Sequence, residues 1–416
     1  VAALRHGFDR AEPVGPLPIA PLDLVAELAG TLGGSLPAEL GNAVANLAVA
    51  HTRRPLANPS TDLSCDPSIV DGSEDGSVDA GPDERAAAYE RLVTGGHNLH
   101  PCARTRLGWS VADVLAHDLE AGGTRIAVVG VRRDRLIGDD LGTRPGLPGG
   151  TATHAAQPVH EWQLGHLRRS RPDLFAAGVL ADLDAAPLPA TPTAALRTLH
   201  VPGLGYLKVS LDIQVTSTRR TISVASSRNG PAISALLGDL LAGEPVLLLA
   251  ETAGAACAAA ERDVTAIVRD GLAGRLRPGE IAVPAAALTA APPGSAGSVV
   301  LGLLRADGES PRSFVAGYAR LLLPPLLRLA TRHGIALEAH LQNCLPVFRA
   351  GRPVRMVLRD AAGLRVHRPR LAARGHRLAL WPGSVVGTDD ADVLRAKLGY
   401  TAFQAHLGEL IRHLAV

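Results

Sequence analysis

The chain has 416 residues, which is longer than a single hydrophobic core usually supports, so we expect two or three subdomains. Its 46% hydrophobic and 20% charged residues are typical of a globular protein, while a net charge of +2 and 3% aromatic residues argue against a nucleic-acid-binding surface. The cysteines lie far apart without a CxxC pair, which argues against a disulfide framework and a structural zinc site.

Targeting signals are not evident. No apolar run reaches the length of about 18 residues that a membrane span needs, and the first residues lack the basic-then-apolar pattern of a secretory leader. We therefore expect a cytoplasmic protein. Lys208 and Lys397 are the only lysines among 42 basic residues, so a lysine in this chain indicates a local need.

The N-terminal region is predicted to contain helices on both sides of an acidic linker. Residues 22–51 should form two helices that break at Gly33–Gly34, because Leu and Val recur every three and four residues. Residues 57–84 are acidic and rich in Pro, Gly and Ser, which predicts a solvated linker. A short helix over 83–96 should end at Gly95–Gly96, a pair that suits a left-handed cap.

The stretch TGGHNLHPCARTRLGW, residues 94–109, concentrates hydrogen-bond donors between Gly and Pro residues. His100 is followed within six residues by Arg104 and Arg106, and His97 precedes it. Taken alone, this loop is compatible with an anion site, a metal site or a plain turn.

Residues 204–216, LGYLKVSLDIQVT, alternate between apolar and polar side chains, which predicts one strand with a buried and a polar face. Lys208 and Thr216 then point the same way, and Arg219 and Arg220 follow at the end of the strand. A polar face turned to solvent is the commoner explanation of such a pattern, whereas the rarity of lysine in this chain favours a functional face.

Other segments are predicted to be helical, and the sequence shows no internal repeat. These segments are residues 231–243, with Pro231 in the first turn; 253–272; 312–334, with a kink at Pro324–Pro325; and 390–416.

Residues 335–363 are predicted to form a strand followed by a hairpin. Glu338, His340 and Gln342 should share one face of the strand, and RAGR should make the turn. Folding back about Ala350–Gly351 then brings Arg359–Asp360 opposite Leu341–Gln342. Burying such a polar cluster is costly unless its members pair with one another or hold a ligand, and a structural hydrogen-bond network is an equally good explanation.

Cationic and imidazole donors facing carboxylate and amide oxygens suit a magnesium-bound polyphosphate. The sequence has no GxxxxGK[ST] loop, no GxGxxG motif and no protein-kinase signature, which excludes the commonest nucleotide-binding architectures. A zinc hydrolase built on His97 and His100 lacks a third ligand and an HExxH motif, so we rank it low.

Three motifs resemble those of one enzyme family. GGHNLHPCARTRLGW is similar to its GHPxHPxxKxRxGF signature, LKVSLDIQVTSTRRTIS to its KlsLxxxITsxxRTI segment, and EAHLQNCLPVFRAGRPVRMVLRDAAGLR to its EaHxQNxLvxxxxGxPxxxxxRDxxG segment. This is the aerobactin-synthetase (IucA/IucC) family of siderophore synthetases that work without a peptide synthetase assembly line. The motifs occur in the family's order, and the resemblance covers roughly residues 20–370.

The resemblance implies an α+β fold of several subdomains, hand-like with thumb, fingers and palm, whose palm is an antiparallel sheet surrounded by helices. It implies a ligase that uses ATP and Mg2+ to convert a carboxylate of citrate or a related di- or tricarboxylic acid into an acyl-adenylate, releasing pyrophosphate. An amine, hydroxylamine or alcohol then gives an amide or ester and AMP. The implied partners are these small molecules, with no nucleic acid or membrane, and family members commonly form homodimers.

The resemblance also assigns roles to the residues that match its motifs. The implied catalytic residues are Lys208, Arg220 and His340. The implied nucleotide-binding residues are His97, His100, Arg104, Arg197, Lys208 and Gln342. The implied contacts to the carboxylic acid are Thr216, Arg220 and His340, and the implied magnesium ligands are Glu338, Asn343 and Asp360.

The chain departs from the family at several points. Asn98 replaces a Pro, Arg104 replaces a Lys, and Ala194–Ala195 replace serines that could donate hydroxyls to ATP. The family normally continues for about a hundred residues or more past the equivalent of Val416, so we expect part of the acceptor pocket to be missing.

The expected organisation is an N-terminal helical region with the linker, a nucleotide-loop and central-sheet region, a palm region with the active-site hairpin, and the start of a ferric-reductase-like helical region. Their bounds are 1–82, 83–245, 246–380 and 381–416. Two other functions stay open: a Mg-ATP phosphotransferase, which would release ADP, and a shortened family member that only binds ligand.

Overall fold

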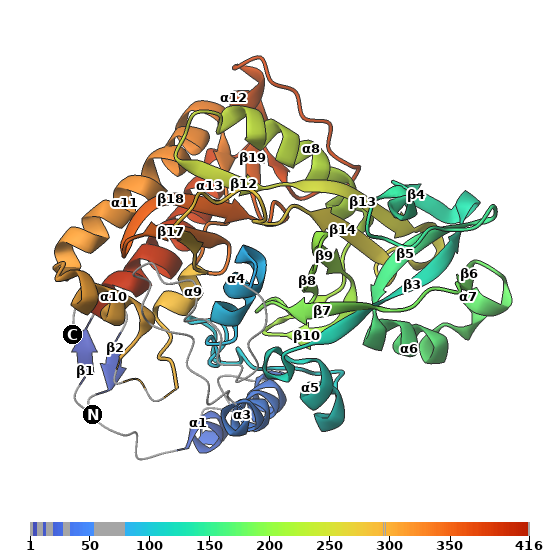
Figure 1. Cartoon of the computed structure of the whole chain (residues 1–416), viewed down its shortest axis with the longest axis horizontal. Helices are drawn as coiled ribbons and strands as arrows, with labels where there is room; N and C mark the ends of the chain where they lie inside the picture. The colour runs from blue at the N-terminus through green and yellow to red at the C-terminus, as the bar shows by residue number, and fades with distance from the viewer. Residues whose placement is uncertain are drawn as a thin grey trace.

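The computed structural model describes residues 3–5, 11–13, 20–27, 34–53, 80–293, 295 and 297–414, so residues 57–79 of the predicted acidic linker lie outside the described part. The protein has the expected α+β fold of several subdomains. Figure 1 shows a lobe built on a large sheet at the right, a helix-rich lobe at the upper left, and N-terminal helices below.

A nine-stranded, fully antiparallel sheet forms the right-hand lobe. The order along the sheet is β4-β13-β14-β9-β8-β7-β3-β5, with β6 also paired to β3. Its strands are β3 (Thr124–Arg132), β4 (Leu136–Gly138), β5 (His154–His160), β6 (Leu180–Asp182), β7 (Leu188–Pro192), β8 (Thr198–Val201), β9 (Gly205–Val209), β13 (Glu251–Cys257) and β14 (Thr265–Arg269). Helices α6 (Glu161–Ser170), α7 (Pro172–Ala176) and α8 (Val224–Leu240) pack beside it.

The upper-left lobe contains a four-stranded sheet of order β12-β18-β17-β15, and C-terminal helices pack around this sheet (Figure 1). Its strands are β12 (Val246–Leu249), β15 (Glu280–Ala282), β17 (Cys344–Arg349) and β18 (Arg352–Arg359), and a small sheet joins β16 (Ile335–Ala336), β19 (Arg365–His367) and β20 (Gly387–Thr388). The helices are α9 (Ala285–Leu288), α10 (Val299–Asp307), α11 (Pro311–Arg328), α12 (Arg368–Ala372), α13 (Ala391–Leu398) and α14 (Glu409–Leu414), with π-helical turns η6 (Leu329–His333) and η7 (Gly399–Gly408). The largest buried apolar cluster lies between these helices and this sheet.

Most N-terminal elements lie in the lower part of Figure 1, and α4 lies in the centre between the two lobes. They are β1 (Ala3–Arg5), β2 (Ala11–Pro13), α1 (Pro21–Glu27), α3 (Leu36–Thr52), α4 (Pro82–Glu90) and α5 (Val111–His117). The hairpin of β10 (Leu211–Val215) and β11 (Thr218–Arg220) and the 3-10 turns η2 (Leu119–Ala121), η3 (Arg133–Arg135), η4 (Leu141–Thr143) and η5 (Ala258–Ala260) complete the fold. Within the described residues, no helix is both long and apolar enough to cross a membrane.

The helix predicted over 253–272 is wrong. Its two halves form β13 and β14, which pair with each other in the middle of the large sheet. The small side chains that favour a helix in isolation serve close packing here, because α8 lies directly on β13: a Cβ added at Gly254 would fall 2.1 Å from the backbone oxygen of Ser227.

The single strand predicted over 204–216 is also wrong, because the chain leaves the large sheet at Ser210. Ser210 accepts a hydrogen bond from the backbone of Ile222 (3.0 Å), and β10 then pairs with β11 instead of continuing in the large sheet. Lys208 stays in β9, buried inside the sheet, whereas Thr216 lies at the end of the hairpin with φ 58°, so the predicted shared face does not exist.

The strand predicted to carry Glu338, His340 and Gln342 ends at Ala336, and residues 337–343 form turns. The hairpin turn at Ala350–Gly351 is confirmed by φ angles of 48° and 76°. A register shift between Val347 and Phe348 places Arg359 opposite Asn343 instead of Gln342.

The remaining helix predictions mostly hold. The helices of 22–51 appear as α1 and α3, the kinked helix of 312–334 as α11 and η6, and the C-terminal helices as α13, η7 and α14. The helix predicted to start at Pro231 begins earlier, at Val224, because Ser223 caps it by accepting a hydrogen bond from the backbone of Ser226 (3.2 Å).

Candidate functional site

Two adjoining cavities lie between the large sheet, the 94–109 loop and the turns of 337–343. The large cavity has a volume of about 560 Å3 and a largely apolar wall, whereas the small cavity measures about 230 Å3 and is lined mainly by charged and polar side chains. Arg220, His340 and Gln342 line both cavities. They therefore mark the place where ligands held in the two cavities would meet.

Most of the sequence-predicted site residues line these cavities. The large cavity is lined by His97, His100, Arg104, Thr216, Arg220, His340 and Gln342. The small cavity is lined by Arg197, Arg220, Glu338, His340, Gln342, Asn343 and Asp360. Lys208 lines neither cavity and lies behind Asp360.

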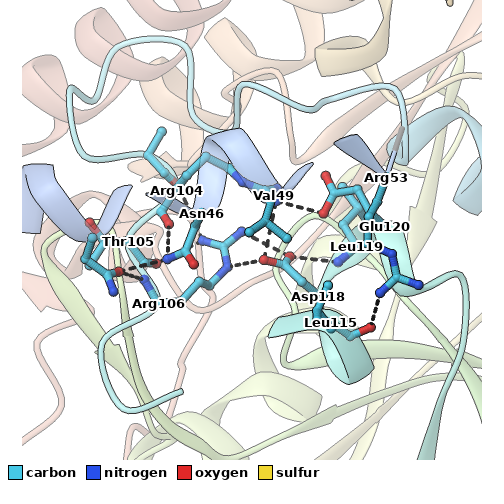
Figure 2. A network of polar contacts seen from close by, with 12 residues as sticks. Asn46, Val49, Arg53, Arg104, Thr105, Arg106, Leu115, Asp118, Leu119 and Glu120 are labelled. Carbon is cyan, nitrogen blue, oxygen red and sulfur yellow. Dashed lines mark hydrogen bonds and ion pairs between the residues drawn. The ribbon is translucent and has the colours of Figure 1, made fainter. Parts of the chain in front are cut away.

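The two arginines of the 94–109 loop are buried in a network of carboxylates (Figure 2). Arg104 Nη2 lies 2.7 Å from Glu120 and 3.4 Å from Asp118, and Arg106 Nε lies 2.8 Å from Asp118. The charges of this network largely compensate one another. The guanidinium of Arg104 is thus already paired with two carboxylates where it borders the large cavity.

Helix α3 is hydrogen-bonded to the same loop (Figure 2). Asn46 donates to the backbone oxygen of Arg104 (3.1 Å), and Asn42 accepts from the backbone of Arg106 (2.7 Å). Arg53, at the end of α3, donates to the backbone oxygen of Leu115 (2.7 Å). These contacts hold the loop, so that the histidines before Arg104 are presented on a fixed backbone.

The histidines of the site present the same ring nitrogen to ligand. In each of His97, His100 and His340, Nδ1 accepts a hydrogen bond from the backbone N–H of the residue two positions later in the chain. The distances are 3.2, 3.0 and 3.2 Å. Burial lowers the pKa of all three, and neighbouring His340, His100 and Arg220 help to lower the pKa of His97 to about 4. A neutral ring that accepts at Nδ1 carries its proton on Nε2, so each histidine is a neutral donor near pH 7.

A compact cluster of two cations and two carboxylates lies at the end of the small cavity. Its members are Lys208, Glu251, Arg269 and Asp360. Lys208 Nζ lies 2.7 Å from Asp360 Oδ1 and 3.6 Å from Glu251, while Arg269 lies 3.1 Å from Glu251 and 3.3 Å from Asp360. Burial alone would raise the pKa of Asp360, but Lys208 and Arg269 hold it well below its usual range. Asp360 is therefore an anion that two cations orient.

Arg197, directly before β8, and Arg220, at the end of β11, both line the small cavity. Arg197 donates to the backbone oxygens of Arg220 (3.3 Å) and Thr221 (3.2 Å), and Arg220 donates to Thr216 Oγ1 (3.2 Å). Burial and the charges of Arg197 and Arg106 lower the pKa of Arg220 to about 10, which leaves it protonated at neutral pH. Two cations held this close favour an anionic ligand between them.

Several buried donors of the small cavity have no partner within the described residues. They include Nε of Arg220, Nε of Arg269 and Nη1 of Arg359. Three guanidinium groups with unpaired N–H groups around one cavity are costly unless a ligand with several acceptor oxygens satisfies them. Polyphosphate or polycarboxylate has that chemistry.

Three site residues were not identified from the sequence, namely Glu90, Glu251 and Arg269, and Arg359 was placed in the polar cluster of the predicted hairpin without a role. Arg269 faces Glu251 across β14 and β13, and it lies in the segment wrongly predicted as a helix, which begins two residues after Glu251. Arg359 pairs with Glu90 of α4 at 2.6 Å, a contact between distant parts of the chain. Arg359 directly precedes Asp360, and that adjacency was the one available signal.

A metal-binding group of the usual kind is absent from the described residues, since no three His, Cys, Asp or Glu side chains are placed to hold an ion together. Magnesium bound to phosphates needs only one or two carboxylates and keeps its remaining ligands as water. Glu338, Asn343 and Asp360 line the small cavity and offer two carboxylates and an amide, so the donor set fits such an ion. Without ligand, Lys397 lies 2.8 Å from Glu338.

Comparisons with known proteins concern the family and the fold of the chain. The model of the IucA / IucC family matches residues 85–290, and that of the ferric iron reductase FhuF-like transporter matches residues 312–416. The uncharacterized protein y4xN of Sinorhizobium fredii is 29% identical over 279 residues, which cover 61% of this chain and 44% of that protein. Staphyloferrin A synthase of Staphylococcus aureus is 24% identical over 366 residues, covering 78% and 60%. The chain thus spans roughly half the length of these relatives.

Solved structures share the fold. Aerobactin synthetase IucC from Klebsiella pneumoniae superimposes with a TM-score of 0.76 at 18% identity, over 99% of this chain and 79% of that one. ATP-bound aerobactin synthetase IucA from the same species gives a TM-score of 0.69 at 19% identity, over 94% and 77%.

Proposed function

Since the chain belongs to the IucA/IucC family, we propose that it is an ATP-dependent siderophore synthetase. It activates a carboxylate of citrate or a related di- or tricarboxylic acid as an acyl-adenylate and condenses it with an amine, hydroxylamine or alcohol. The observation that carries this proposal is the set of unpaired guanidinium donors of Arg220, Arg269 and Arg359 around the small cavity.

The two cavities are proposed to bind different substrates. The small cavity, with its arginines, suits the phosphates of ATP, because buried guanidinium groups pair with phosphate oxygens through several hydrogen bonds. The large cavity suits the carboxylic acid and the acceptor, since it is wider and less charged. Their shared wall of Arg220, His340 and Gln342 is then where carboxylate and α-phosphate meet.

The chemistry needs no protein nucleophile. A carboxylate oxygen attacks the α-phosphorus, the bond to pyrophosphate breaks, and pyrophosphate leaves. The acceptor nitrogen or oxygen then attacks the acyl carbon, AMP leaves, and the acceptor loses a proton. Arg220 offsets charge on the reacting phosphate and the neutral His340 donates from Nε2, contributions of the preorganised kind that are worth on the order of a hundredfold in rate each.

Mg2+ would be held by Glu338, Asn343 and Asp360 and would neutralise phosphate charge when bound. Lys208 and Arg269 keep Asp360 ionised, and they set the direction in which its carboxylate faces the cavity. A cytoplasmic location, where ATP is present, fits the reaction.

The test incubates the 416-residue chain with MgATP, hydroxylamine and citrate, succinate or 2-oxoglutarate, and measures hydroxamate and pyrophosphate. We expect hydroxamate and pyrophosphate in equal amounts with at least one acid. Release of ADP without hydroxamate would indicate a phosphotransferase instead, and nucleotide binding without either product would indicate a protein that only binds ligand.

A further inference from the structure

The turns of 337–343 carry Glu338, His340 and Gln342 without belonging to a strand, yet every backbone oxygen in them has a partner. The donors are Thr401 to Leu337, Asn343 Nδ2 to Glu338, His406 to Ala339, Asn343 N to His340, Ala286 N to Leu341, the Arg359 side chain to Gln342 and Arg359 N to Asn343. The positions of the ligand-facing side chains are therefore set by other parts of the molecule.

The C-terminal helices supply three contacts to consecutive residues of these turns. Lys397 of α13 pairs with the Glu338 side chain at 2.8 Å, Thr401 donates to the backbone oxygen of Leu337 at 3.3 Å, and His406 lies 2.9 Å from that of Ala339. Thr401 and His406 both belong to η7, a π-helical stretch of the kind often found at functional sites.

The hydrogen bonds of His406 define one tautomer. A carbonyl oxygen can only accept, so Nδ1 carries the proton and donates to Ala339. Burial, with a smaller effect of His340, lowers the pKa of His406 to about 4, so the ring is neutral and Nε2 accepts the hydroxyl of Tyr318 at 2.6 Å. Both His406 and Tyr318 are fully buried. A fixed ring thus holds the peptide directly before His340.

We propose that His406, oriented by Tyr318, is a positioning residue for His340: its Nδ1–H fixes the Ala339 peptide, which directs the imidazole of His340 toward the meeting point of the two cavities. The inference rests on the proposed function, because that function gives His340 its task. The inference also means that the segment matched by the FhuF-like model, residues 312–416, helps to shape the site through the hydrogen bond from His406 to Ala339.

The test compares three substitutions of His406. His406→Asn can place a side-chain N–H where Nδ1 was, whereas His406→Gln places its amide nearer the position of Nε2, and His406→Leu removes both bonds. We expect His406→Leu to lower kcat for hydroxamate formation on the order of a hundredfold, with KM for ATP changed less, because a misplacement of about 1 Å has that effect. His406→Asn should recover most of the rate and His406→Gln should not.

Thr401→Val, also in η7, is the matched control, since the single hydroxyl hydrogen of Thr401 goes mainly to the backbone oxygen of Lys397 (2.8 Å) and only weakly to that of Leu337 (3.3 Å). We expect less than about threefold loss there. All rates are expressed per folded molecule, with the folded fraction taken from urea unfolding. An unchanged kcat in a folded His406→Leu protein, or equal losses in the Asn and Gln variants, would overturn the inference.

If the unsubstituted chain forms no hydroxamate with any acid, the proposed function fails and calorimetry decides the positioning role. We then expect His406→Leu to weaken MgATP binding by the smaller factor expected for KM, since the displaced His340 also lines the small cavity, His406→Asn to restore it and Thr401→Val to leave it unchanged. Equal affinities in all of these proteins would contradict the positioning role on its own.

Discussion

Lys208 Nζ lies 2.7 Å from Asp360 Oδ1, deep behind the small cavity, and the Lys208 side chain is 1% exposed. Asp360 has a positive φ of 69°, so its backbone bends to bring the carboxylate to the amine. A buried pair of this kind costs desolvation free energy, and it is stable only while both partners are present.

Replacing Lys208 by Met should therefore lower the free energy of unfolding by about 3 kcal/mol, because Asp360 and Glu251 are left with one cation fewer. The double variant Lys208→Met with Asp360→Asn should recover at least half of that loss, since neither member is then an unpaired charge. Both proteins should lack hydroxamate formation. Urea unfolding measures the first effect, and full activity in a folded Lys208→Met protein would show that the amine has no part in the reaction.

Arg104 and Arg220 should respond differently to the same substitution. Arg104→Lys keeps a charge between Asp118 and Glu120 but loses the forked geometry, so we expect a modest loss of stability, about 1 kcal/mol, and a nearly unchanged KM for ATP. Arg220→Lys removes an unpaired donor from the small cavity and should lower kcat roughly tenfold or more. Steady-state kinetics on the two proteins decides. The reverse ranking would show that Arg104 contacts the nucleotide.

Acid should destabilise the fold through its buried histidines. Burial lowers the pKa of His97 to about 4, of His160 to about 3 and of His406 to about 4, whereas unfolded histidines titrate near 6.5. Between these values the unfolded chain binds more protons than the native one, so the free energy of unfolding rises with pH and falls on acidification from about pH 6.5.

Each such histidine contributes a slope of about 1.4 kcal/mol per pH unit in this window. His160→Asn should remove one of these contributions and still cap α6, because the Asn oxygen can accept the backbone N–H of Trp162. The measurement is urea unfolding between about pH 5 and pH 7, and identical slopes in the substituted and unsubstituted proteins would contradict the assignment.

A matched glycine pair tests the contact between α8 and β13. Gly254→Ala would place a Cβ 2.1 Å from the backbone oxygen of Ser227, which neither element can relieve without moving, so we expect a loss of about 3 kcal/mol. Gly238→Ala, in α8 and with open space around it, should stabilise by about 0.5–1 kcal/mol. Thermal or urea unfolding gives both values, and equal effects would mean that the two elements do not pack this closely.

The same contact explains where sequence reasoning about the fold failed. The alanines of 253–260 indicated a helix, but the small residues of this segment allow α8 to lie on the strand, and no local pattern distinguishes the two uses. The helix over 312–334 was predicted correctly, because a helix that buries one face repeats apolar residues every three to four positions in the sequence.

For the site, the motifs located most cavity-lining residues, but they did not indicate how those residues are held. Arg104 and Arg106 looked like ligand donors, and their pairing with Asp118 and Glu120 depends on a fold that brings two loops together. Arg269 was hidden by the wrong helix prediction. The chain leaves the large sheet at Ser210, which separates Lys208 from Thr216. This change depends on a hydrogen bond from Ile222, and the alternation of apolar and polar side chains does not predict it.

The two lysines of the sequence both pair with carboxylates that line the small cavity, Lys208 with Asp360 and Lys397 with Glu338. An amine-selective reagent that modifies lysines would therefore label almost nothing else in the described part of the chain. Lys397, with a side chain that is 20% exposed, should react before the buried Lys208. Each amine contacts a carboxylate that lines the small cavity, so a ligand that changes these ion pairs should change the rate of labelling, which mass spectrometry can follow without any engineered label.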